Sequence, residues 1–577
     1  MAKFLIGLGT GVLLVFLSVF LVFFALLRFR ERPPEITANS VLVLRLTGSL
    51  PEKTPVEIPF LSSGPSLTVS NVWMALRKAA VDSHIRAVVL EPESLRTGWA
   101  KLQELRQDVA QFRKSGKPVY AYLHTPSARE YYLATAADRI YISPADQVYL
   151  KGLRAEMMFF KNTLDKLGVS VDVEHAGKYK DFGDQFTRSD MSPETREVIN
   201  SVVDGIYGDL LAGIAEGRKK TPEQVSALID QGLFLAPELE KAGLVDELRF
   251  EDQMWGELKS RLKLDDKSGD LKRVKAETYA RVPPEAAGLT GKSRVALVVG
   301  EGDIVRGDPD NPASDEDSLA STSFDKLLDQ VGNDSSIRAV VVRIDSPGGE
   351  VNASDDIWRS MNLLSKKKPL VISMSDVAAS GGYYMAMTGD PIVAYPTTET
   401  GSIGVVFGKP NLHGLYAKLG ITKDAIQRGK YAAIDSDYTP LNPDEKQKLQ
   451  HGIDVSYQDF LAKVAAARHR TPAEIDPVAQ GRVWLGSQAK MHGLVDTIGG
   501  LDTAIEMAKK KANIPAAENV TVVSYPARRS IVDLLLQRRS QEDVLDVKLR
   551  AVFRDMPFRA WMEGGFLRMM PYWITVK

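Results

Sequence analysis

Cysteine is absent from this chain of 577 residues. Its absence excludes disulfide bonds, cysteine nucleophiles and thiolate metal sites, and is compatible with either side of a membrane. Histidine is sparse, and the seven present form no His-Glu-x-x-His motif. No Gly-x-Ser-x-Gly elbow occurs either, so the sequence supports neither zinc hydrolysis nor α/β-hydrolase chemistry. The net charge of −1 offers no basic surplus for binding nucleic acid.

Charge is also missing from residues 4–27. This run is long enough to cross a bilayer as a helix, which takes roughly 20 apolar residues. No small-x-small cleavage site follows it, so we expect residues 1–32 to be a retained membrane anchor rather than a cleaved signal. Three arginines follow the run (Arg28, Arg30, Arg32), whereas only Lys3 and the terminal amine precede it. Taken alone, the positive-inside rule would place the bulk of the chain in the cytoplasm.

The rest of the chain contains an internal duplication. Residues 82–89 (DSHIRAVV) and 334–341 (DSSIRAVV) align at an offset of 252 positions (334 minus 82). The same offset pairs Tyr131-Tyr132 with Tyr383-Tyr384, and Gly177-Lys-Tyr with Gly429-Lys-Tyr. A chain of this length exceeds what a single core normally organises, so two similar domains with appendages are expected.

Both copies alternate buried strands with helical segments, which predicts α/β domains with largely parallel sheets. The expected strands are residues 40–46, 87–90 and 119–123 in the first copy and 294–299, 339–344 and 370–374 in the second. The predicted organisation is an anchor at 1–32, a first repeat at 40–250, a charged inter-domain linker at 251–293, a second repeat at 294–515 and a C-terminal extension at 516–577. An oligomer contact, a membrane-surface helix and a helix packed on its own domain all remain open for residues 528–577.

The two copies differ at two positions that could do chemistry. Ser380 of the second copy aligns with Ala128 of the first, whereas Lys180 of the first aligns with Ala432 of the second. One copy therefore supplies a hydroxyl and the other an amine. If the copies pack so that these groups meet, the protein has a composite Ser/Lys dyad, an arrangement that activates a nucleophile.

Ser380 is the candidate nucleophile because small residues surround it in Ala-Ala-Ser-Gly-Gly, between a predicted strand and a predicted helix. Backbone N–H groups at such a helix start can face developing negative charge. The double glycine Gly348-Gly349 is kept only in the copy that has the serine, and with the amide of Gly381 it is the candidate oxyanion hole. A helix cap for Ser380 and an ordinary Pro-Gly turn at 347–349 are the structural alternatives.

Lys180 is the candidate general base. It can act only if burial lowers its pKa from about 10.4 towards roughly 7 to 8. The neighbouring Lys178 is a weaker candidate, because its counterpart Lys430 is kept in the other copy. We interpret His124 and His175, which lie near these positions, as ordinary residues.

These motifs together resemble signal peptide peptidase A, also called protease IV, in its long duplicated form. The resemblance covers residues 40 to about 515 and rests on five segments: Ser346-Pro-Gly-Gly, Ala379-Ser-Gly-Gly-Tyr-Tyr, Thr400-Gly-Ser-Ile-Gly, Gly177-Lys-Tyr-Lys-Asp and Met191-Ser-Pro. It implies that Ser380 is the nucleophile, that Lys180 is its general base and that Ser402 helps to hold the lysine. The first-copy counterpart of Ser402 is Leu150.

The resemblance also implies a crotonase-like, Clp-protease-like α/β fold in each repeat and a membrane-anchored homotetramer. It places the catalytic domains on the periplasmic or extracytoplasmic face of a bacterial inner membrane, against the prediction from the arginines. The implied substrates are cleaved signal peptides and other apolar peptides, and no metal or cofactor is expected. Two rival hypotheses remain: a crotonase-type acyl-CoA enzyme, and a non-catalytic membrane scaffold.

Overall fold

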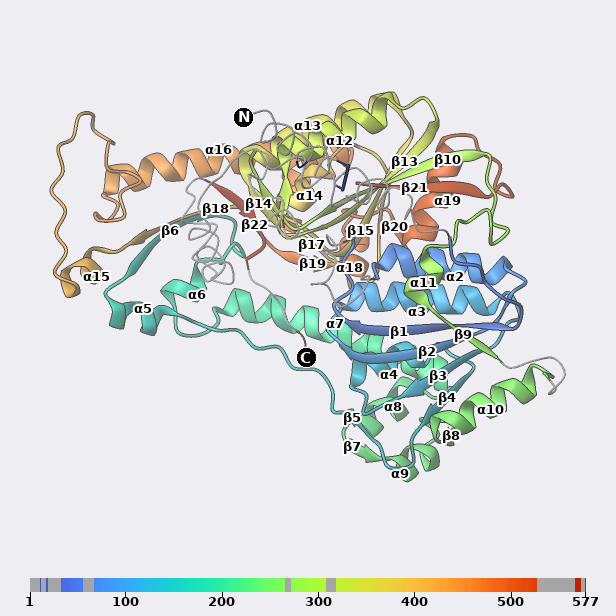
Figure 1. Ribbon diagram of the computed structural model, residues 1–577. Coiled ribbons are helices and arrows are strands. Elements are labelled where there is room, and N and C mark those ends of the chain that lie inside the picture. Colours follow the sequence, from blue (N-terminus) through green and yellow to red (C-terminus); the bar gives the residue numbers. More distant parts are fainter. Residues whose placement is uncertain are drawn as a thin grey trace, which may run out of the picture.

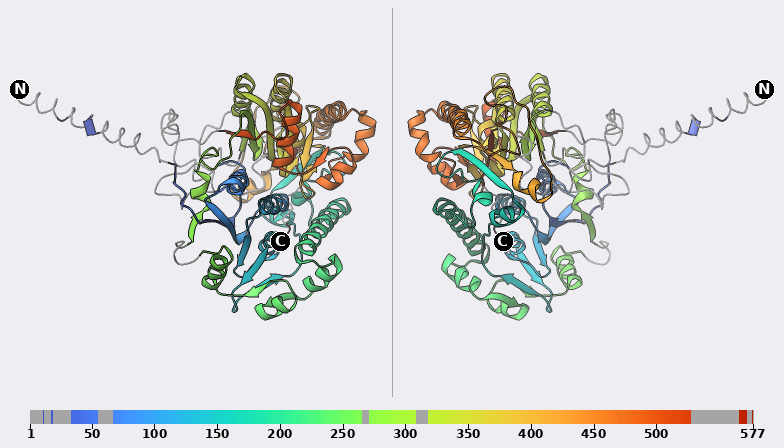
Figure 2. Two further views of the ribbon diagram at one scale, coloured as in Figure 1. Left: turned by 90° about the vertical axis from the view of Figure 1, so that its right-hand side faces the viewer. Right: turned by 90° about the vertical axis from the view of Figure 1, so that its left-hand side faces the viewer.

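The computed structural model describes residues 11, 17–18, 33–54, 67–264, 271–307, 318–526, 566–571 and 576. Apart from three of its residues, the predicted anchor at 1–32 lies outside these ranges, as does most of the segment 528–577. The described chain forms two α/β units, the first repeat drawn in blue to green and the second in yellow to red (Figures 1 and 2).

The first repeat is built on a parallel sheet of six strands in the order β8-β4-β3-β2-β1-β9. β3 is buried at every residue and β1 and β2 over most of their length, as expected for a sheet covered on both faces. The strands are β1 (Ser40–Gly48), β2 (Ile85–Leu95), β3 (Val119–Leu123), β4 (Arg139–Ile142), β8 (Glu247–Leu248) and β9 (Lys272–Lys275).

The second repeat has the same strand order, β20-β16-β15-β13-β10-β21, and every neighbouring pair is parallel. This agreement confirms the duplication and the predicted α/β class. The strands are β10 (Ser293–Glu301), β13 (Ile337–Ser346), β15 (Leu370–Ala379), β16 (Ile392–Ala394), β20 (Thr497–Ile498) and β21 (Val520–Tyr525). Beyond β15, the short strands β17 (Glu399–Gly401) and β19 (Val483–Leu485) extend the sheet.

Two strands lie outside the predicted repeat segments. β9 lies within the predicted linker at 251–293, and β21 lies within the predicted extension at 516–577. Each pairs in parallel with the first strand of its repeat, β1 or β10. The first sheet therefore ends in the charged segment Lys-Arg-Val-Lys, a composition typical of an edge strand.

Helices cover both sheets and also repeat (Figure 1). The corresponding pairs are α2 (Val69–Val81) with α12 (Ser321–Asn333), α3 (Trp99–Arg113) with α13 (Val351–Lys367), α4 (Ala128–Ala134) with α14 (Gly381–Met385), α7 (Pro193–Arg218) with α16 (Pro443–Ala467), α8 (Pro222–Ile229) with α17 (Pro472–Ile475), α9 (Ala236–Lys241) with α18 (Gly486–Met491), and α10 (Glu251–Arg261) with α19 (Leu501–Lys511). The remaining helices are α5 (Lys161–Leu167), α6 (Asp184–Thr187), α11 (Ala276–Ala280) and α15 (His413–Lys418).

Within the described ranges, α7 is the single helix that is long and apolar enough to span a membrane. Its apolar side packs into the core of the first repeat through Val198, Val202, Ile206 and Leu210. An amphipathic helix with one buried side is what a globular core requires, so α7 is part of that core.

A third sheet joins the two repeats, in the order β12-β11-β14-β22-β18-β6. All but two of its strands come from the second repeat. β6 belongs to the first repeat, and β22 belongs to the C-terminal extension. The strands are β12 (Ser318–Ala320), β11 (Asp303–Val305), β14 (Gly348–Glu350), β22 (Leu567–Met569), β18 (Val405–Asn411) and β6 (Ser170–Ala176). A separate two-stranded sheet pairs β5 (Gln147–Leu150) with β7 (Gly232–Leu235).

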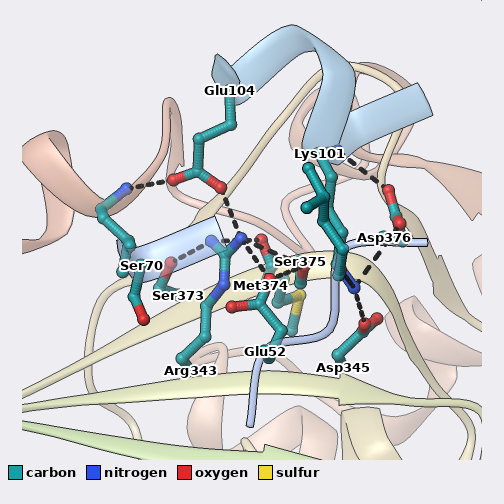
Figure 3. A network of polar contacts seen from close by, with 12 residues as sticks. Glu52, Ser70, Lys101, Glu104, Arg343, Asp345, Ser373, Met374, Ser375 and Asp376 are labelled. Atoms are coloured by element: carbon teal, nitrogen blue, oxygen red, sulfur yellow. Dashed lines mark hydrogen bonds and ion pairs between the residues drawn. The ribbon is translucent and has the colours of Figure 1, made fainter. Parts of the chain in front are cut away.

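A buried ionic network also connects the repeats (Figure 3). Arg343 on β13 is fully buried and makes ion pairs with Glu52 and Glu104 of the first repeat. The Nζ atom of Lys101 on α3 lies 2.7 Å from the Oδ2 atom of Asp345 in the second repeat. Asp376, also from the second repeat, accepts the Gly98 and Lys101 N–H groups and so caps α3, whose own cap residue has no side chain.

Candidate active site

Ser380 lies in a strained turn between β15 and α14. Its φ of 52° and ψ of −112° are rare for a residue with a side chain, and such strain often accompanies functional sites. The Ser380 N–H donates to Gly401 O at 2.8 Å, which ties the turn to β17. In the first repeat, Ser127 caps α4 with an ordinary φ of −87°, and Ala128 is the first helical residue. The strained turn therefore occurs in the copy that carries the serine.

Lys180 reaches the second repeat because β6 pairs antiparallel with β18. The segment that follows β6 packs against Gln480 and Gly481: Tyr179 N–H donates to Gln480 O at 2.8 Å. A Cβ atom on Gly481 would lie 2.7 Å from the Lys180 backbone nitrogen, and one on Gly177 would lie 2.6 Å from the Gln480 carbonyl carbon. Both glycines have positive φ, so the close approach and the backbone conformation each favour glycine there.

The lysine and the two serines meet in the interior. Lys180 Nζ lies 2.8 Å from Ser380 Oγ, 2.9 Å from Ser402 Oγ and 2.9 Å from Ser402 O. All three residues are completely buried. Burial lowers the pKa of Lys180 well below 10.5, and the nearby Asp181 carboxylate only partly opposes this shift. The structure thus brings together the three residues expected for a dyad and its support.

The weaker candidates lie apart from this cluster. The Lys178 ammonium lies 3.8 Å from Glu194 and is more than half exposed. His175 is exposed and contacts Gly177 O, whereas His124 pairs with Asp146. In the described part of the chain, His, Asp and Glu side chains nowhere gather in a group of three that could hold a metal ion.

The glycines proposed for the oxyanion hole converge next to Ser380. Gly348 has a φ of 105°, and a Cβ atom there would lie 2.6 Å from the Gly381 nitrogen. A Cβ atom on Gly349 would lie 2.0 Å from Ile304 O on the neighbouring β11. The double glycine is therefore required for close packing of β14 against both the Ser380 turn and β11.

Sequence reasoning missed one neighbour of this site. β22 lies against β14, and Arg568 on β22 is buried close enough to Lys180 to lower the lysine pKa further. No motif marks Leu567-Arg-Met, since a strand of three residues is specified by the partners it finds rather than by its own pattern.

The sequence of this chain is similar to that of known peptidases. Residues 111–265 and 362–515, one segment in each repeat, match the model of peptidase family S49. Serine protease SPPA, chloroplastic, of Arabidopsis thaliana is 37% identical over 524 residues, which cover 90% of this chain and 76% of that protein. The chain belongs to peptidase family S49. Its tandem S49 domains confirm the resemblance inferred from the motifs.

As an S49 peptidase, the protein is a serine protease of the signal peptide peptidase and protease 4 group. Protease 4 of Salmonella typhi is 32% identical over 503 residues, which cover 83% of this chain and 79% of that protein. Among solved structures, ClpP1 from Listeria monocytogenes matches 36% of this chain and 91% of its own, with 16% identity and a TM-score of 0.21. Family membership favours the protease over both rival hypotheses, the acyl-CoA enzyme and the scaffold.

Proposed function

We propose that this S49 peptidase is a membrane-anchored serine endopeptidase that uses Ser380 as nucleophile and Lys180 as general base. The observation that carries the proposal is the 2.8 Å contact between Lys180 Nζ and Ser380 Oγ, made across the two repeats in a fully buried site. A buried amine with a lowered pKa is neutral over more of the physiological range, and a neutral amine has a lone pair for the serine proton.

The chemistry then proceeds in two halves. Lys180 takes the Ser380 proton while Oγ attacks the peptide carbonyl, and the resulting oxyanion accepts hydrogen bonds from the Gly381 N–H and from Gly349 or Gly348. Lys180 returns the proton to the leaving amine, which leaves an acyl-enzyme on Ser380. Lys180 next activates a water molecule, whose attack releases the acid and regenerates the serine. None of these steps calls for a metal or a cofactor.

Ser402 acts as a positioning residue in this scheme. Its hydroxyl and carbonyl oxygens both accept from Lys180 Nζ. With both N–H groups of the neutral amine engaged in this way, its lone pair is directed towards Ser380. Ser402 itself has a positive φ of 50° and donates its N–H to Arg482 O at 2.7 Å. These contacts supply the support that a general base needs to stay within hydrogen-bond reach of the nucleophile.

The substrates and setting we propose are cleaved signal peptides and other apolar peptides at a bacterial inner membrane. The uncharged run at 4–27 supports an anchor, and the family resemblance supports an extracytoplasmic catalytic domain. The resemblance also supports a homotetramer. A homotetramer could bury exposed apolar residues of α5, α15 and the loop that follows α15. These residues are Leu167, Leu419, Ile421 and Ile426.

A fluorophosphonate labelling experiment tests the dyad. The detergent-solubilised protein is treated with the probe, and the adduct is located by peptide mass in the parent, in Lys180→Ala and in Lys178→Ala. We expect an adduct on Ser380 that is lost in Lys180→Ala and kept in Lys178→Ala, since Lys178 is exposed and contacts Glu194. A folded parent without an adduct on Ser380 would refute the proposal.

A further inference from the structure

The C-terminal strand β22 lies in the third sheet as an inserted strand between β14 and β18 (Figure 1). It pairs antiparallel with both: Gly349 faces Arg568 on one side, and Val406 faces Leu567 on the other. β14 carries the double glycine, and β18 follows Ser402. An extended segment between two such edges has the geometry by which sheets bind peptides, through main-chain hydrogen bonds.

The register places the Arg568 carbonyl at the proposed oxyanion hole. Met570 N–H donates to Pro347 O at 2.8 Å, and Val351 N–H donates to Phe566 O at 3.1 Å. Hydrogen-bonded pairs alternate along an antiparallel ladder, so Gly349 and Arg568, midway between these two bonds, are also such a pair.

Steric contacts point to the same position. A Cβ atom on Gly348 would lie 1.9 Å from Arg568 O, and one on Gly381 would lie 3.1 Å from it. The oxygen thus lies between the double glycine and the residue after Ser380. That is where the carbonyl of a bond about to be cleaved belongs.

The Arg568 side chain fills a pocket formed by α14 and α16. Its guanidinium carbon is 3.6 Å from the centre of the Tyr384 ring and 5.3 Å from that of Phe460. Nη2 lies 3.3 Å from Asp459 Oδ2 and 3.5 Å from Ser456 O. The side chain is 2% exposed, so aromatic faces and an acid enclose the cation.

The side chains around the Arg568 guanidinium carry a net negative charge. The Tyr384 hydroxyl oxygen lies 2.6 Å from Asp355 Oδ1 and 2.8 Å from Asp459 Oδ2, so its one proton can be donated to either carboxylate. Lys463 Nζ pairs with both carboxylates, at 2.9 and 2.8 Å. Two carboxylates and one ammonium leave one negative charge over, and Arg568 neutralises it. An apolar side chain in the same place would give up both the ion pair with Asp459 and the cation–π contact with Tyr384.

We infer that the pocket of Tyr384, Asp459 and Phe460 binds the side chain immediately before the cleaved bond and selects arginine there, with lysine second. This inference rests on the proposed function, because it assigns a subsite of the Ser380 centre. It adds a specificity that an apolar signal peptide alone would not require. It also means that β22 must leave before a peptide can bind, so the segment around Arg568 competes with substrate.

A peptide series tests the subsite. Quenched fluorescent peptides of one sequence carry Arg, Lys, Leu, Ala or Glu before the cleaved bond, and kcat/KM is measured with the full-length detergent-solubilised protein. We expect Arg to exceed Leu by about tenfold or more, as for a hydrogen-bonded charge in a partly enclosed site. Mass spectrometry of the products verifies that cleavage follows the varied residue. In Asp459→Asn, the ratio of Arg to Leu should fall towards one.

The matched control is Asp454→Asn, which removes the same charge from an exposed position on the same helix. It should leave the Arg preference unchanged. Labelling by a small fluorophosphonate, which has no side chain for the pocket, reports whether the Ser380 centre of each variant is intact. In Arg568→Ala the pocket loses its internal occupant, and KM for the Arg peptide should fall.

The outcomes separate the two proposals. If Ser380 is labelled but Leu peptides are cleaved as well as Arg peptides, the subsite inference is wrong and the proposed function stands. An equal loss of Arg preference in Asp454→Asn and Asp459→Asn also overturns it, because the effect would then be a general charge effect. A folded protein that takes no label and cleaves no peptide overturns both.

Discussion

In the proposed dyad, the environment of one side chain, Lys180, decides whether the base is neutral. Burial lowers its pKa well below 10.5, so the amine loses its proton at a lower pH than a solvated lysine would. The protonated form cannot accept the serine proton, and activity should therefore rise with pH through the lowered pKa. Replacing Lys180 with Ala should reduce kcat/KM by roughly 10²- to 10⁴-fold, the usual contribution of a general base.

Asp181 should set the position of that rise. Burial raises the pKa of Asp181 to about 6, and above that pH its negative charge favours the protonated lysine. We expect Asp181→Asn to move the acidic limb of the pH profile of kcat/KM to lower pH. Asp190→Asn, at an exposed position nearby, should leave the limb in place. A limb that is the same in Asp181→Asn and the parent would show that Asp181 does not act on the base.

The lowered pKa of Lys180 also makes the free energy of unfolding depend on pH. Between the lowered pKa and 10.5, an unfolded chain holds a proton on Lys180 that the folded chain lacks. The free energy of unfolding therefore rises with pH in that window, and below the window the buried lysine makes the fold less stable. The dyad thus costs stability at the pH values where a solvated lysine would be charged.

At the scale of elements, the pairing of β6 with β18 places the base. The tight contact is between Gly481 and the Lys180 backbone, where a Cβ atom would lie 2.7 Å away. Gly481→Ala should displace Lys180 and abolish fluorophosphonate labelling of Ser380, while circular dichroism stays close to that of the parent.

The matched control is Gly429→Ala, at the second-repeat counterpart of Gly177. Gly429 has a φ of +97°, as unfavourable for alanine as the +76° of Gly481, but a Cβ atom there would meet no heavy atom within 4 Å. The difference between the two variants therefore isolates the contact with Lys180 from backbone strain. Equal labelling in both would contradict the positioning role of this contact.

The sequence predicted the duplication and the pairing of Ser380 with Lys180, because aligned copies reveal where each has lost a functional group. It also predicted β3 at the observed bounds, since a fully apolar run between Lys-Pro and a turn has few alternatives. The strands β9, β21 and β22 were missed. They are short and pair with β1, β10 and β14 from distant parts of the chain, so tertiary pairing rather than local pattern decides them. β6 has no strand counterpart at residues 422–428 of the second repeat, and so the duplication gave no hint of it.

At the scale of the molecule, the proposed mechanism requires that the two repeats stay in register, since each supplies one half of the proposed dyad. The ionic network around Arg343 is a second buried polar part of their interface, beside the contacts of Lys180 (Figure 3). One guanidinium serves two carboxylates. The pKa of Glu52 is lowered by Arg343, whereas burial keeps the pKa of Glu104 raised. The two buried carboxyl groups therefore both depend on the single positive charge of Arg343.

Removing that guanidinium should separate the repeats before they unfold. We expect Arg343→Met to lower the free energy of unfolding by roughly 3–5 kcal/mol, because it leaves two buried carboxylates without their partner. Lys430→Met, which breaks a surface pair with Asp444 at 2.6 Å, should leave the free energy of unfolding close to that of the parent. In urea, labelling of Ser380 in Arg343→Met should be lost at a lower concentration than the far-ultraviolet circular dichroism signal. Coincident loss of both signals would mean that the network stabilises each repeat internally rather than the contact that joins Lys180 to Ser380.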